Sequence, residues 1–559
     1  MNTVSTTVLI VGAGPVGLVS ALLLEQLGID YLIVEKNPTL HQAPQAHVIS
    51  SRTLEICRSL AISDHLIREA GPHPADTSNI RWVDRLLGRD LGTFSLASDL
   101  PAIEHLLANT PTPTTNLSQD SFEHLLFNYL ATPEKLHFEH RWQNYNPTPQ
   151  GYASTVINSE NQTITMHSRY IIGADGAGSL VRRAIGAEMQ GPDNLQTFVN
   201  IHFSANMRKH LQGREGLLYW VMDNTCEGIF IAHDIDSNWI FMTPIDDDES
   251  TTPIDFDKFA ALLNKAIGTE IDLTINSMNS WRMTAQISDT YQAGNIFLVG
   301  DAAHRFPPTG GIGMNTGFQD AHNLAWKIAL VEKGFDASLL ESYGPERKPV
   351  AEINSAQSLN NSLKMIEVAI AIDADGDEKI SMNDIDTTLN DPTRRAQVQS
   401  TINDQSAHFN MSGLDLGFCY TSSAVLYDGE PPISENSVSY YVASTTPGAR
   451  LPHAWLLEEG RKISTLDLVK CGRFLVMSTA PNLELEQAVN KLSNRGYAID
   501  LVTISADTKI KSADDSFMPL FGNTVLLVRP DGHIAARIEP QPAAEKIHQI
   551  ISTLFPAKY

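Results

Sequence analysis

The chain has 559 residues, of which 42% are hydrophobic and 19% are charged. At roughly 150 residues per domain, this length predicts two to four domains with hydrophobic cores of ordinary size. Asp and Glu outnumber Lys and Arg by 65 to 40, and the formal net charge of −25 argues against nucleic acid or an anionic membrane surface as the main partner.

The N-terminal segment has the pattern of a strand, a glycine-rich turn, a helix and a second strand. Val8–Val11 is a run of β-branched residues and leucine, and it leads directly into the turn GAGPVG at 12–17. A helix rich in alanine and leucine follows over 18–27, and a second strand follows over Tyr31–Val34. This order of elements is typical of a βαβ unit that binds a dinucleotide.

Four residues of this unit have the properties that a dinucleotide site needs. Gly12 allows the tight turn, Gly14 lets the backbone approach a pyrophosphate, and Gly17 lets the helix pack closely against the strand. The free amides at the helix N-terminus would face the phosphates. Glu35 directly follows the second strand, where an acidic group can bind a ribose hydroxyl.

Alternating hydrophobic residues between 187 and 284 predict a mostly antiparallel sheet. The strand-like runs are Thr197–Phe203, Leu217–Met222, Gly228–Ala232 and Trp239–Met242. By contrast, 79–118 is rich in turns and prolines with little periodicity, and 370–395 is acidic. We therefore expect turn-like structure in these two regions.

Two later strands each run into a distinctive glycine motif. The strand Ile171–Gly173 begins the stretch GADGAGSLVR at 173–182. The strand Phe297–Val299 is followed by GDAAHRFPPTGGIGMN at 300–315. Apolar residues at helical spacing then predict a helix over 319–331.

Together with the first glycine turn, these motifs resemble the FAD-dependent aromatic hydroxylases, a family that includes para-hydroxybenzoate, phenol and polyketide hydroxylases. The three motifs occur in the family's order, and the resemblance covers roughly 5–345 and, more loosely, 413–559. It implies an α/β fold with a Rossmann-type FAD-binding domain, an inserted, mostly antiparallel β-sheet substrate domain, and a C-terminal thioredoxin-like domain.

The same resemblance implies domain boundaries. In chain order, the expected parts are an FAD-binding part at 1–78, a substrate-domain contribution at 79–118, an FAD-binding part at 119–186, the substrate-binding sheet at 187–284, an FAD-binding part at 285–345, a helical linking region at 346–445 and the thioredoxin-like domain at 446–559. The last domain lacks a CxxC pair and its Cys471 is isolated, so we expect a structural or oligomerising role for it.

The resemblance implies that FAD is held by Gly12, Gly14, Gly17, Glu35, Arg52, Gln119, Asp175, Gly176, Asp301, Gly313, Met314 and Asn315. Among these, Arg52 would contact the pyrophosphate, Gln119 the ribityl chain and pyrophosphate, and Asp301 the ribityl hydroxyls. The amides of 313–315 would stabilise the negative charge that reduced flavin carries near N1 and the C2 carbonyl.

Four residues are candidates for catalysis: His47, Arg282, Pro307 and Pro308. Phenol hydroxylases have, at the position of His47, an acid that activates the phenol, so His47 would be the base or a substrate contact. A phenol pKa near ~10 and a histidine pKa near ~6.5 make full ionisation cost about 5 kcal/mol. A nearby cation such as Arg282 would have to assist.

The activity that the resemblance implies is the hydroxylation of a phenolic or polyketide-like aromatic molecule. NADPH or NADH would reduce FAD, O2 would add at flavin C4a, and the hydroperoxide would transfer one oxygen to the ring. Epoxidation and Baeyer–Villiger oxidation on the same fold remain alternatives. No second GxGxxG unit occurs, so the nicotinamide cofactor has no domain of its own; Asp175 and Gly176 would help in its use, and Arg182 and Arg183 are candidates for docking it.

Residues 373–384, DADGDEKISMND, resemble a calcium-binding loop. Glu378 stands where such a loop requires glycine, and Asp384 is shorter than the usual glutamate. These departures favour an acidic surface loop over a metal site.

The four cysteines, Cys57, Cys226, Cys419 and Cys471, lie far apart in the sequence. This spacing predicts neither a disulfide framework nor a zinc site, and isolated thiols are typical of a reducing compartment. The sequence has no apolar run of membrane-spanning length, and its start lacks the basic region of a secretory signal. We expect a cytoplasmic protein with no membrane partner and no metal, and the resemblance implies a homodimer or higher homo-oligomer.

Overall fold

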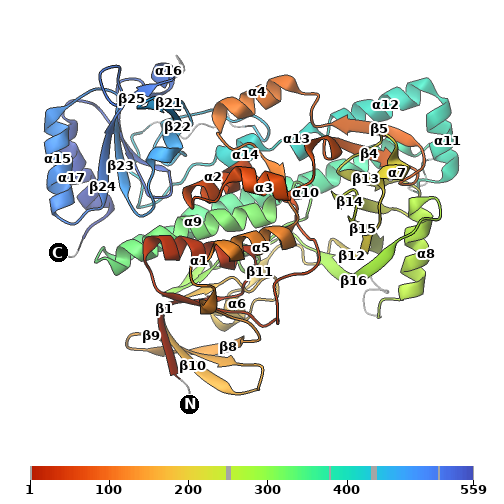
Figure 1. Ribbon diagram of the computed structural model, residues 1–559, viewed down its shortest axis with the longest axis horizontal. Helices are drawn as coiled ribbons and strands as arrows, with labels where there is room; N and C mark the ends of the chain where they lie inside the picture. Colours follow the sequence, from red (N-terminus) through yellow and green to blue (C-terminus); the bar gives the residue numbers. More distant parts are fainter. Residues whose placement is uncertain are drawn as a thin grey trace.

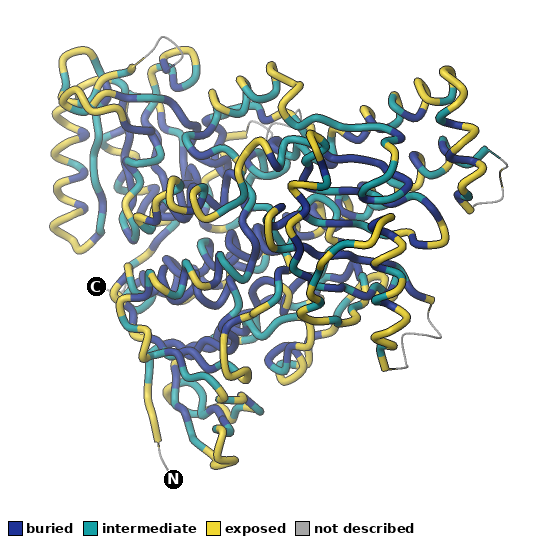
Figure 2. The backbone as a smooth tube through the Cα atoms, turned by 45° about the vertical axis from the view of Figure 1, so that its right-hand side comes forward, coloured by how far each residue is buried: buried dark blue, intermediate teal, exposed yellow. Residues whose placement is uncertain are grey.

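The computed structural model describes residues 3–246, 253–374, 376, 379–429, 437–513 and 517–557. Figure 1 shows a sheet with its helices in the centre and lower part, a seven-stranded sheet at the right, and a C-terminal unit, drawn in blue, at the upper left. Buried backbone runs through all these parts (Figure 2). Among the described residues, no helix combines the length and the apolar character needed to span a membrane.

The first sheet places the ends of its parallel strands at one edge. Its order is β18-β19-β10-β1-β2-β7, with β19, β10, β1, β2 and β7 parallel, and β8 and β9 extend it from β10. Gly12, Glu35 and Asp175 follow the carboxyl ends of β1, β2 and β10, where open α/β sheets bind ligands. The strands are Thr3–Val11 (β1), Tyr31–Val34 (β2), Leu136–His137 (β7), Arg141–Thr148 (β8), Gly151–Ile157 (β9), Thr163–Gly173 (β10), Gln292–Ala293 (β18) and Ile296–Leu298 (β19).

Three helices pack together beside this sheet: α1 (Pro15–Leu27), α5 (Gln119–Tyr129) and α9 (Ile312–Glu332). α9 begins seven residues before the predicted helix at 319–331. Its first turns contain glycine, which is a poor helix former, so the apolar spacing begins only later. Gly317 is needed there for close packing, because a Cβ on it would lie 2.5 Å from Val16 and 3.0 Å from the Cα of Gly300.

The seven-stranded sheet combines strands from 79–95 with strands from 196–283. Its order is β16-β12-β15-β14-β13-β4-β5, and all neighbours are antiparallel except β13 and β4. One face packs on α8 (Phe256–Ile267) through residues such as Phe203 and Phe241. The strands are Asn79–Val83 (β4), Asp90–Ser95 (β5), Gln196–Ser204 (β12), Leu218–Val221 (β13), Gly228–Asp234 (β14), Asn238–Ile245 (β15) and Thr274–Met283 (β16).

The two regions expected to be turn-like contain regular elements. Besides β4 and β5, 79–118 forms α4 (Leu100–Asn109), and 370–395 contains α11 (Met382–Asn390) and the start of α12 (Pro392–Asn403). Asp384 explains the helix in an acidic segment, because its carboxylate and Ser381 form a capping box at the start of α11. Asp384 also accepts a hydrogen bond from the amide of Ala374. Of the calcium-like loop, Asp375, Asp377 and Glu378 lie outside the described residues.

The remaining elements connect these parts. The long helix α10 (Tyr343–Ile372) runs from beside α9 to the seven-stranded sheet. The shorter elements are β3 (Val48–Ile49), α2 (Ser51–Ser59), α3 (Asp64–Ala70), β6 (Thr115–Asn116), α6 (Leu180–Ala184), β11 (Met189–Gln190), α7 (Arg208–Leu211), β17 (Gln286–Ser288), β20 (His304–Arg305), α13 (Ser406–Phe409) and α14 (Ser412–Leu416).

The C-terminal unit has a four-stranded sheet of order β24-β23-β26-β27 and a three-stranded sheet of order β22-β21-β25. β23 and β24 are parallel, whereas β26 and β27 run antiparallel to their neighbours. Cys471 is a free thiol here, as are the other three cysteines. The elements are Trp455–Glu458 (β21), Arg461–Ser464 (β22), Phe474–Ser478 (β23), Leu483–Asn494 (α15), Ile499–Thr503 (β24), Ile510–Ser512 (β25), Phe517–Phe521 (α16), Val525–Val528 (β26), Ile534–Ile538 (β27) and Ala543–Leu554 (α17).

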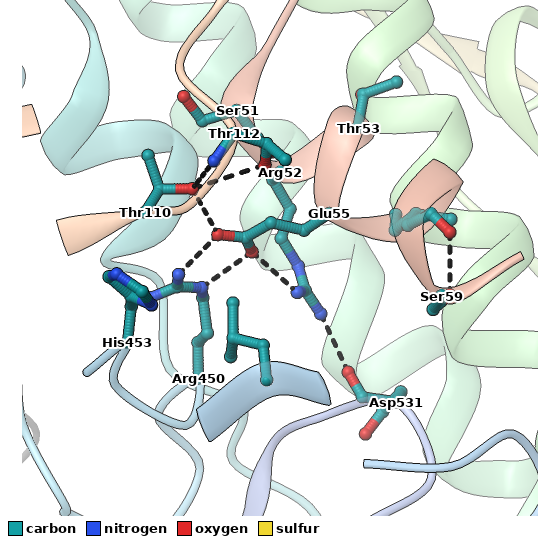
Figure 3. A network of polar contacts seen from close by, with 12 residues as sticks. Ser51, Arg52, Thr53, Glu55, Ser59, Thr110, Thr112, Arg450, His453 and Asp531 are labelled. Carbon is teal, nitrogen blue, oxygen red and sulfur yellow. Dashed lines mark hydrogen bonds and ion pairs between the residues drawn. The ribbon is translucent and has the colours of Figure 1, made fainter. Parts of the chain in front are cut away.

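Buried charges join this unit to the rest of the chain. Figure 3 shows Glu55 of α2, whose carboxylate accepts hydrogen bonds from Arg52 at 3.0 Å, from Thr110 at 2.7 Å and from both Nε and Nη2 of Arg450. Arg52 also donates to the carbonyl of Asp531 at 2.8 Å. Because every group is buried and paired, separating the two parts would leave charges without partners.

A second buried network lies beside the first. Glu346 of α10 accepts hydrogen bonds from both terminal nitrogens of Arg529, at 2.6 and 2.8 Å, and from Lys327 at 2.8 Å. Arg529 also pairs with Asp531. Burial would raise the pKa of Glu346, but the Arg529 and Lys327 cations outweigh it and hold the pKa well below its usual range.

Acid is expected to weaken the attachment of the C-terminal unit. Burial would raise the pKa of Glu55, but Arg450 and Arg52 hold it at about 2, against an ordinary value of 4.5. A carboxylate whose pKa is lower in the folded than in the unfolded state stabilises the fold fully when the pH is above the unfolded-state pKa. This stabilisation is lost as the pH falls to the folded-state pKa. Urea unfolding between pH 5 and 2 should therefore show a loss of up to about 3 kcal/mol from this group. In Glu55→Gln the acid-dependent loss should be smaller by that amount, and an equal loss would contradict the assignment.

Candidate active site

A cavity of about 1500 Å³ extends from the carboxyl ends of the first sheet to the inner face of the seven-stranded sheet. The predicted FAD-binding and catalytic residues line it, except Gly17 and Arg52, whereas Arg182 and Arg183 do not. The predicted residues that line it are Gly12, Gly14, Glu35, His47, Gln119, Asp175, Gly176, Arg282, Asp301, Pro307, Pro308, Gly313, Met314 and Asn315.

The first glycine turn forms a closely packed cradle at one end of the cavity. Gly12 has φ +106°, and a Cβ on it would lie 2.3 Å from the carbonyl oxygen of Ala174. A Cβ on Gly17 would lie 2.0 Å from the carbonyl oxygen of Gly12, so Gly17 lets α1 approach the turn and does not face the cavity. Gly14 has no protein atom within 4 Å of its Cβ position, which leaves room for a pyrophosphate beside the start of α1.

Glu35 is oriented by the backbone around it. Its carboxylate accepts hydrogen bonds from the amides of Ala13 at 2.9 Å and Asn37 at 2.8 Å. These bonds fix the acid at the cavity edge next to the glycine turn, while two carboxylate oxygens retain lone pairs for a ribose hydroxyl.

Gln119 begins α5 and lies between the cavity and a buried acid. Its side-chain amide donates to Glu123 at 2.9 Å, and Glu123 also binds His41. The Glu123 hydrogen bond raises the pKa of His41, which also lines the cavity. No sequence motif marks His41 and Glu123, because their contact spans 82 residues.

Arg52, expected beside the pyrophosphate, is held elsewhere. Its guanidinium is bound to Glu55 and to the carbonyl of Asp531, outside the cavity lining. Only its backbone amide takes part in the site, through Asp415 at 2.9 Å. The physical reason is the direction of the side chain from α2 toward the C-terminal unit.

Two charged side chains of the second motif, Asp175 and Arg182, form hydrogen bonds with other groups of the protein. Asp175 accepts hydrogen bonds from Ser179 and from the amides of Leu180 and Val181, and thereby caps the start of α6. The buried Arg182 donates to the carbonyls of Ala302 and Ala177, each at 2.9 Å. Arg182 therefore ties the second and third motifs together, and its donors are not directed to a docked cofactor as expected.

Asp301 presents a carboxylate directly to the cavity. The side chain is exposed to the cavity, and desolvation by the nearby protein raises its pKa, with His304 and Arg305 opposing that rise. Within the described residues, no group hydrogen-bonds its side chain. A carboxylate at this place has both oxygens free to accept hydrogen bonds from a ligand in the cavity.

The third motif forms the start of α9 against this carboxylate. Gly311 is the N-cap with φ +64°, and no side chain caps the helix. The amides of the first turn have no partners within a helix, and Gly313 and Met314 line the cavity. Pro308 supports the turn by accepting a hydrogen bond from Gly311 at 3.0 Å, and Pro307 accepts one from Ser358 at 2.7 Å. The free amides of this first turn can therefore donate hydrogen bonds to an anionic group placed in the cavity.

Asn315 connects α9 to the segment that carries His47. Its amide donates to the carbonyl of Val48 at 2.9 Å, and its oxygen accepts from the amide of Ser50 at 2.9 Å and the hydroxyl of Thr53 at 2.7 Å. The side chain therefore fixes the His47 segment against the helix N-terminus. The sequence motif indicates a role for the backbone amide of Asn315 but not this role of its side chain.

His47 faces the cavity from this segment in a defined protonation state. Its Nδ1 lies 3.0 Å from the side-chain oxygen of Asn116, and because an amide oxygen only accepts, Nδ1 carries the proton. Burial lowers the pKa of His47, so Nε2 of the neutral ring is available as an acceptor.

Apolar residues from the seven-stranded sheet form the far wall. They include Leu218, Trp220, Ile229, Ile231, Ile240 and Met242, together with Trp281 and Phe306. Arg282 of the edge strand β16 lies in the same lining. The cavity thus combines a polar dinucleotide cradle with an apolar compartment suited to an aromatic ring.

Two family models match the chain and together cover most of it. The model described as "FAD binding domain" matches residues 5–358, and the model described as "Aromatic-ring hydroxylase, C-terminal" matches residues 444–557.

Relatives with known activities match over almost their whole length. The 2,4-dichlorophenol 6-monooxygenase of Delftia acidovorans is 29% identical, with 96% of this chain and 95% of the relative covered. The tetracenomycin B2 monooxygenase-dioxygenase of Streptomyces olivaceus is 30% identical, with 96% of each chain covered. Among solved structures, the flavin-dependent monooxygenase PieE in complex with FAD and substrate has a TM-score of 0.90 at 27% identity, with 99% of each chain covered.

These matches confirm the predicted family and its cofactor, FAD. The relatives are named as monooxygenases of phenols and polyketides, which supports ring hydroxylation and not the epoxidase or Baeyer–Villiger alternative. The chain belongs to the FAD-dependent aromatic-ring hydroxylases and is a flavoprotein monooxygenase.

Proposed function

We propose that this monooxygenase hydroxylates a phenolic or polyketide-like aromatic molecule, with NADPH or NADH as reductant and O2 as oxidant. The observation that carries the proposal is the continuity of one cavity, which joins the dinucleotide cradle at Gly14 to an apolar wall with His47 beside it. An aromatic ring on that wall would lie next to the N-terminus of α9.

The residues of the cavity divide the binding of FAD between them. Gly12 and Gly14 would hold the pyrophosphate, Glu35 the ribose, and Asp301 the ribityl chain. Gly313 and Met314 would offer amides to the anionic edge of the reduced ring. Bound FAD would supply the two-electron chemistry and the activation of O2, and the apolar wall would exclude water from it.

His47 would act on the substrate hydroxyl. Its Nε2 accepts, so it can take a hydrogen bond and then the proton from a phenol oxygen as negative charge grows on the ring. Arg282 would stabilise that charge from β16. Pro307 and Pro308 would hold the turn against the reacting ring, and Gln119 would support the middle of FAD.

The finer architecture is also part of the proposal. The parallel sheet would be a Rossmann-type FAD-binding domain, the seven-stranded sheet an inserted substrate domain, and the C-terminal unit a thioredoxin-like domain without redox function, since Cys471 has no partner cysteine. The free thiols favour a cytoplasmic location. We also propose a homodimer or higher homo-oligomer, and light scattering that gives one chain at all concentrations would contradict it.

The proposed activity can be tested with the purified full chain. We expect a yellow protein that releases FAD on denaturation, and NADPH or NADH oxidation that a phenol from a panel of mono- and polycyclic compounds stimulates. Mass spectrometry should show a product heavier by one oxygen. If every compound in such a panel leaves NAD(P)H oxidation at its basal rate and no product gains oxygen, the proposal is wrong.

A substitution at His47 should separate catalysis from cofactor binding. In His47→Leu, turnover of a phenolic substrate should fall by about 100-fold or more, because general-base assistance is lost, while FAD content stays at the wild-type level. The matched control is His65→Leu, since His65 is exposed on α3. Steady-state kinetics at saturating NAD(P)H would measure the effect, and wild-type turnover in His47→Leu would exclude the role.

A further inference from the structure

We propose that His233 and His47 form a two-histidine site for the hydroxyl group of the substrate, with His47 accepting the hydroxyl proton and His233 donating an N–H to the hydroxyl oxygen. This inference rests on the proposed function, because it concerns how that hydroxyl is bound. It assigns a positioning role to a residue of the sheet, which no sequence motif marks.

His233 lies next to His47 although 186 positions separate them in the sequence. The two imidazole rings have centroids 5.7 Å apart and meet edge to face at 82°. His47 lines the cavity, and His233, which is not itself a lining residue, contacts the His47 ring from β14. Two hydrogen bonds of about 2.8 Å each let one hydroxyl oxygen bridge two ring nitrogens, and adjacent imidazole rings are the arrangement in which this can occur.

The nitrogens of His233 have no partner within the described residues. Both Nδ1 and Nε2 are buried without a hydrogen bond, although the residue is only 6% exposed. A neutral imidazole has one donor and one acceptor, and leaving such groups unpaired in a protein interior is unfavourable. A buried polar group of this kind is expected where a ligand supplies the missing partner.

The strand that carries His233 is irregular at this residue. β14 and β15 pair in regular register as far as Ala232 and Trp239, and the register then shifts so that Asp234 is opposite Asn238. His233 is therefore the extra residue of a β-bulge, a feature that re-aims side chains and is common beside active sites. A regular strand would have paired His233 with Asn238.

The charges around His233 favour a neutral donor. The titratable groups that face it are His47 and His202, and there is no carboxylate among them. Burial, followed by these two histidines, lowers the pKa of His233 well below the usual value. A ring that stays neutral keeps one N–H, and a donor to the phenol oxygen eases the transfer of its proton to His47 Nε2.

His202 makes a different contact. Its Nε2 lies 3.0 Å from the side-chain oxygen of Asn238, so one nitrogen of this ring is already paired. His47 likewise has Nδ1 committed to Asn116. Among these three histidines, only His233 has both nitrogens available.

The experiment compares two ligands in the FAD-loaded, oxidised enzyme. Calorimetry would measure the affinity of a phenol that the wild type hydroxylates and of its methyl ether, which cannot donate. In His233→Leu we expect affinity for the phenol to fall about tenfold and affinity for the ether to change less than about twofold. His233→Asn, which keeps a donor, should restore part of the phenol affinity. The double variant His47→Leu/His233→Leu should lose less phenol affinity than the product of the two single losses, because both histidines bind the same hydroxyl.

The outcomes distinguish this inference from the proposed function. If the wild type hydroxylates the phenol but His233→Leu binds phenol and ether as the wild type does, the two-histidine site is wrong and the hydroxylase proposal stands. Equal losses for both ligands would show a packing role only, which also overturns it. If the variants do not fold, nitrogen-15 spectra of histidine-labelled wild type decide, because phenol must shift the His233 signals and the ether must not. If the wild type hydroxylates no phenol, both the two-histidine site and the proposed hydroxylase function are wrong.

Discussion

Replacing Asp301 by alanine should leave a folded protein that loses FAD during purification. Asp301 presents an exposed carboxylate to the cavity, and no described group hydrogen-bonds it, so bound FAD would supply its partners. A hydrogen bond to a charged group contributes about 1.5–3 kcal/mol, which corresponds to roughly a 10- to 150-fold loss of FAD affinity. Fluorescence titration of the apoprotein with FAD would measure it.

Two comparisons make this result specific. Asp301→Asn keeps an acceptor without the charge and should bind FAD with an affinity between those of the wild type and Asp301→Ala. Asp257→Ala removes an exposed acid from the first turn of α8 and should not change FAD binding. Wild-type FAD affinity in Asp301→Ala would mean that the ribityl chain is held by other groups.

Replacing Arg529 by methionine should strongly destabilise the chain. Arg529 is fully buried and pairs with Glu346 and Asp531. Methionine leaves both carboxylates without this cation in the interior, and breaking a buried pair in this way costs about 3–5 kcal/mol. Urea unfolding followed by circular dichroism should show the free energy of unfolding reduced by that amount.

The matched control is an arginine of the same unit whose ion pair is partly exposed to solvent. Arg473 pairs with Asp500 at 2.7 Å, but the Arg473 side chain is 39% exposed. Arg473→Met should therefore cost less than about 1 kcal/mol. If the two variants lose equal stability, the buried network does not hold the C-terminal unit in place.

The glycine-rich end of the cavity could be predicted because its determinants are local. Gly12, Gly14 and Glu35 lie within one βαβ unit, and spacing alone relates them to each other. The same holds for Asp301 and the turn before α9. At these positions the residue type follows directly from a tight turn, a close approach or a strand end.

The remaining interactions depend on contacts that spacing does not encode. Arg52 is within a motif-like stretch, yet its guanidinium binds a carbonyl 479 residues away. Asn315 lies in the third motif, but its side chain serves the His47 segment 265 residues earlier. His233 follows a regular alternation of strand residues, and neither the bulge at this position nor the contact with His47 leaves a mark in the sequence. Each case requires the tertiary partner to be known.

Alternate residues of the seven-stranded sheet serve two different purposes: one set packs in the core, and the other shapes the cavity. On β14 and β15, Phe230 and Phe241 pack in the interior under α8, whereas the neighbouring residues Ile229, Ile231 and Met242 face the cavity. Since adjacent side chains point to opposite faces, every second position can change in volume without disturbing the packing that keeps the sheet folded. Evolution or a directed library can thus vary the shape of the substrate compartment at these positions while the flavin cradle, built from other strands, keeps its geometry.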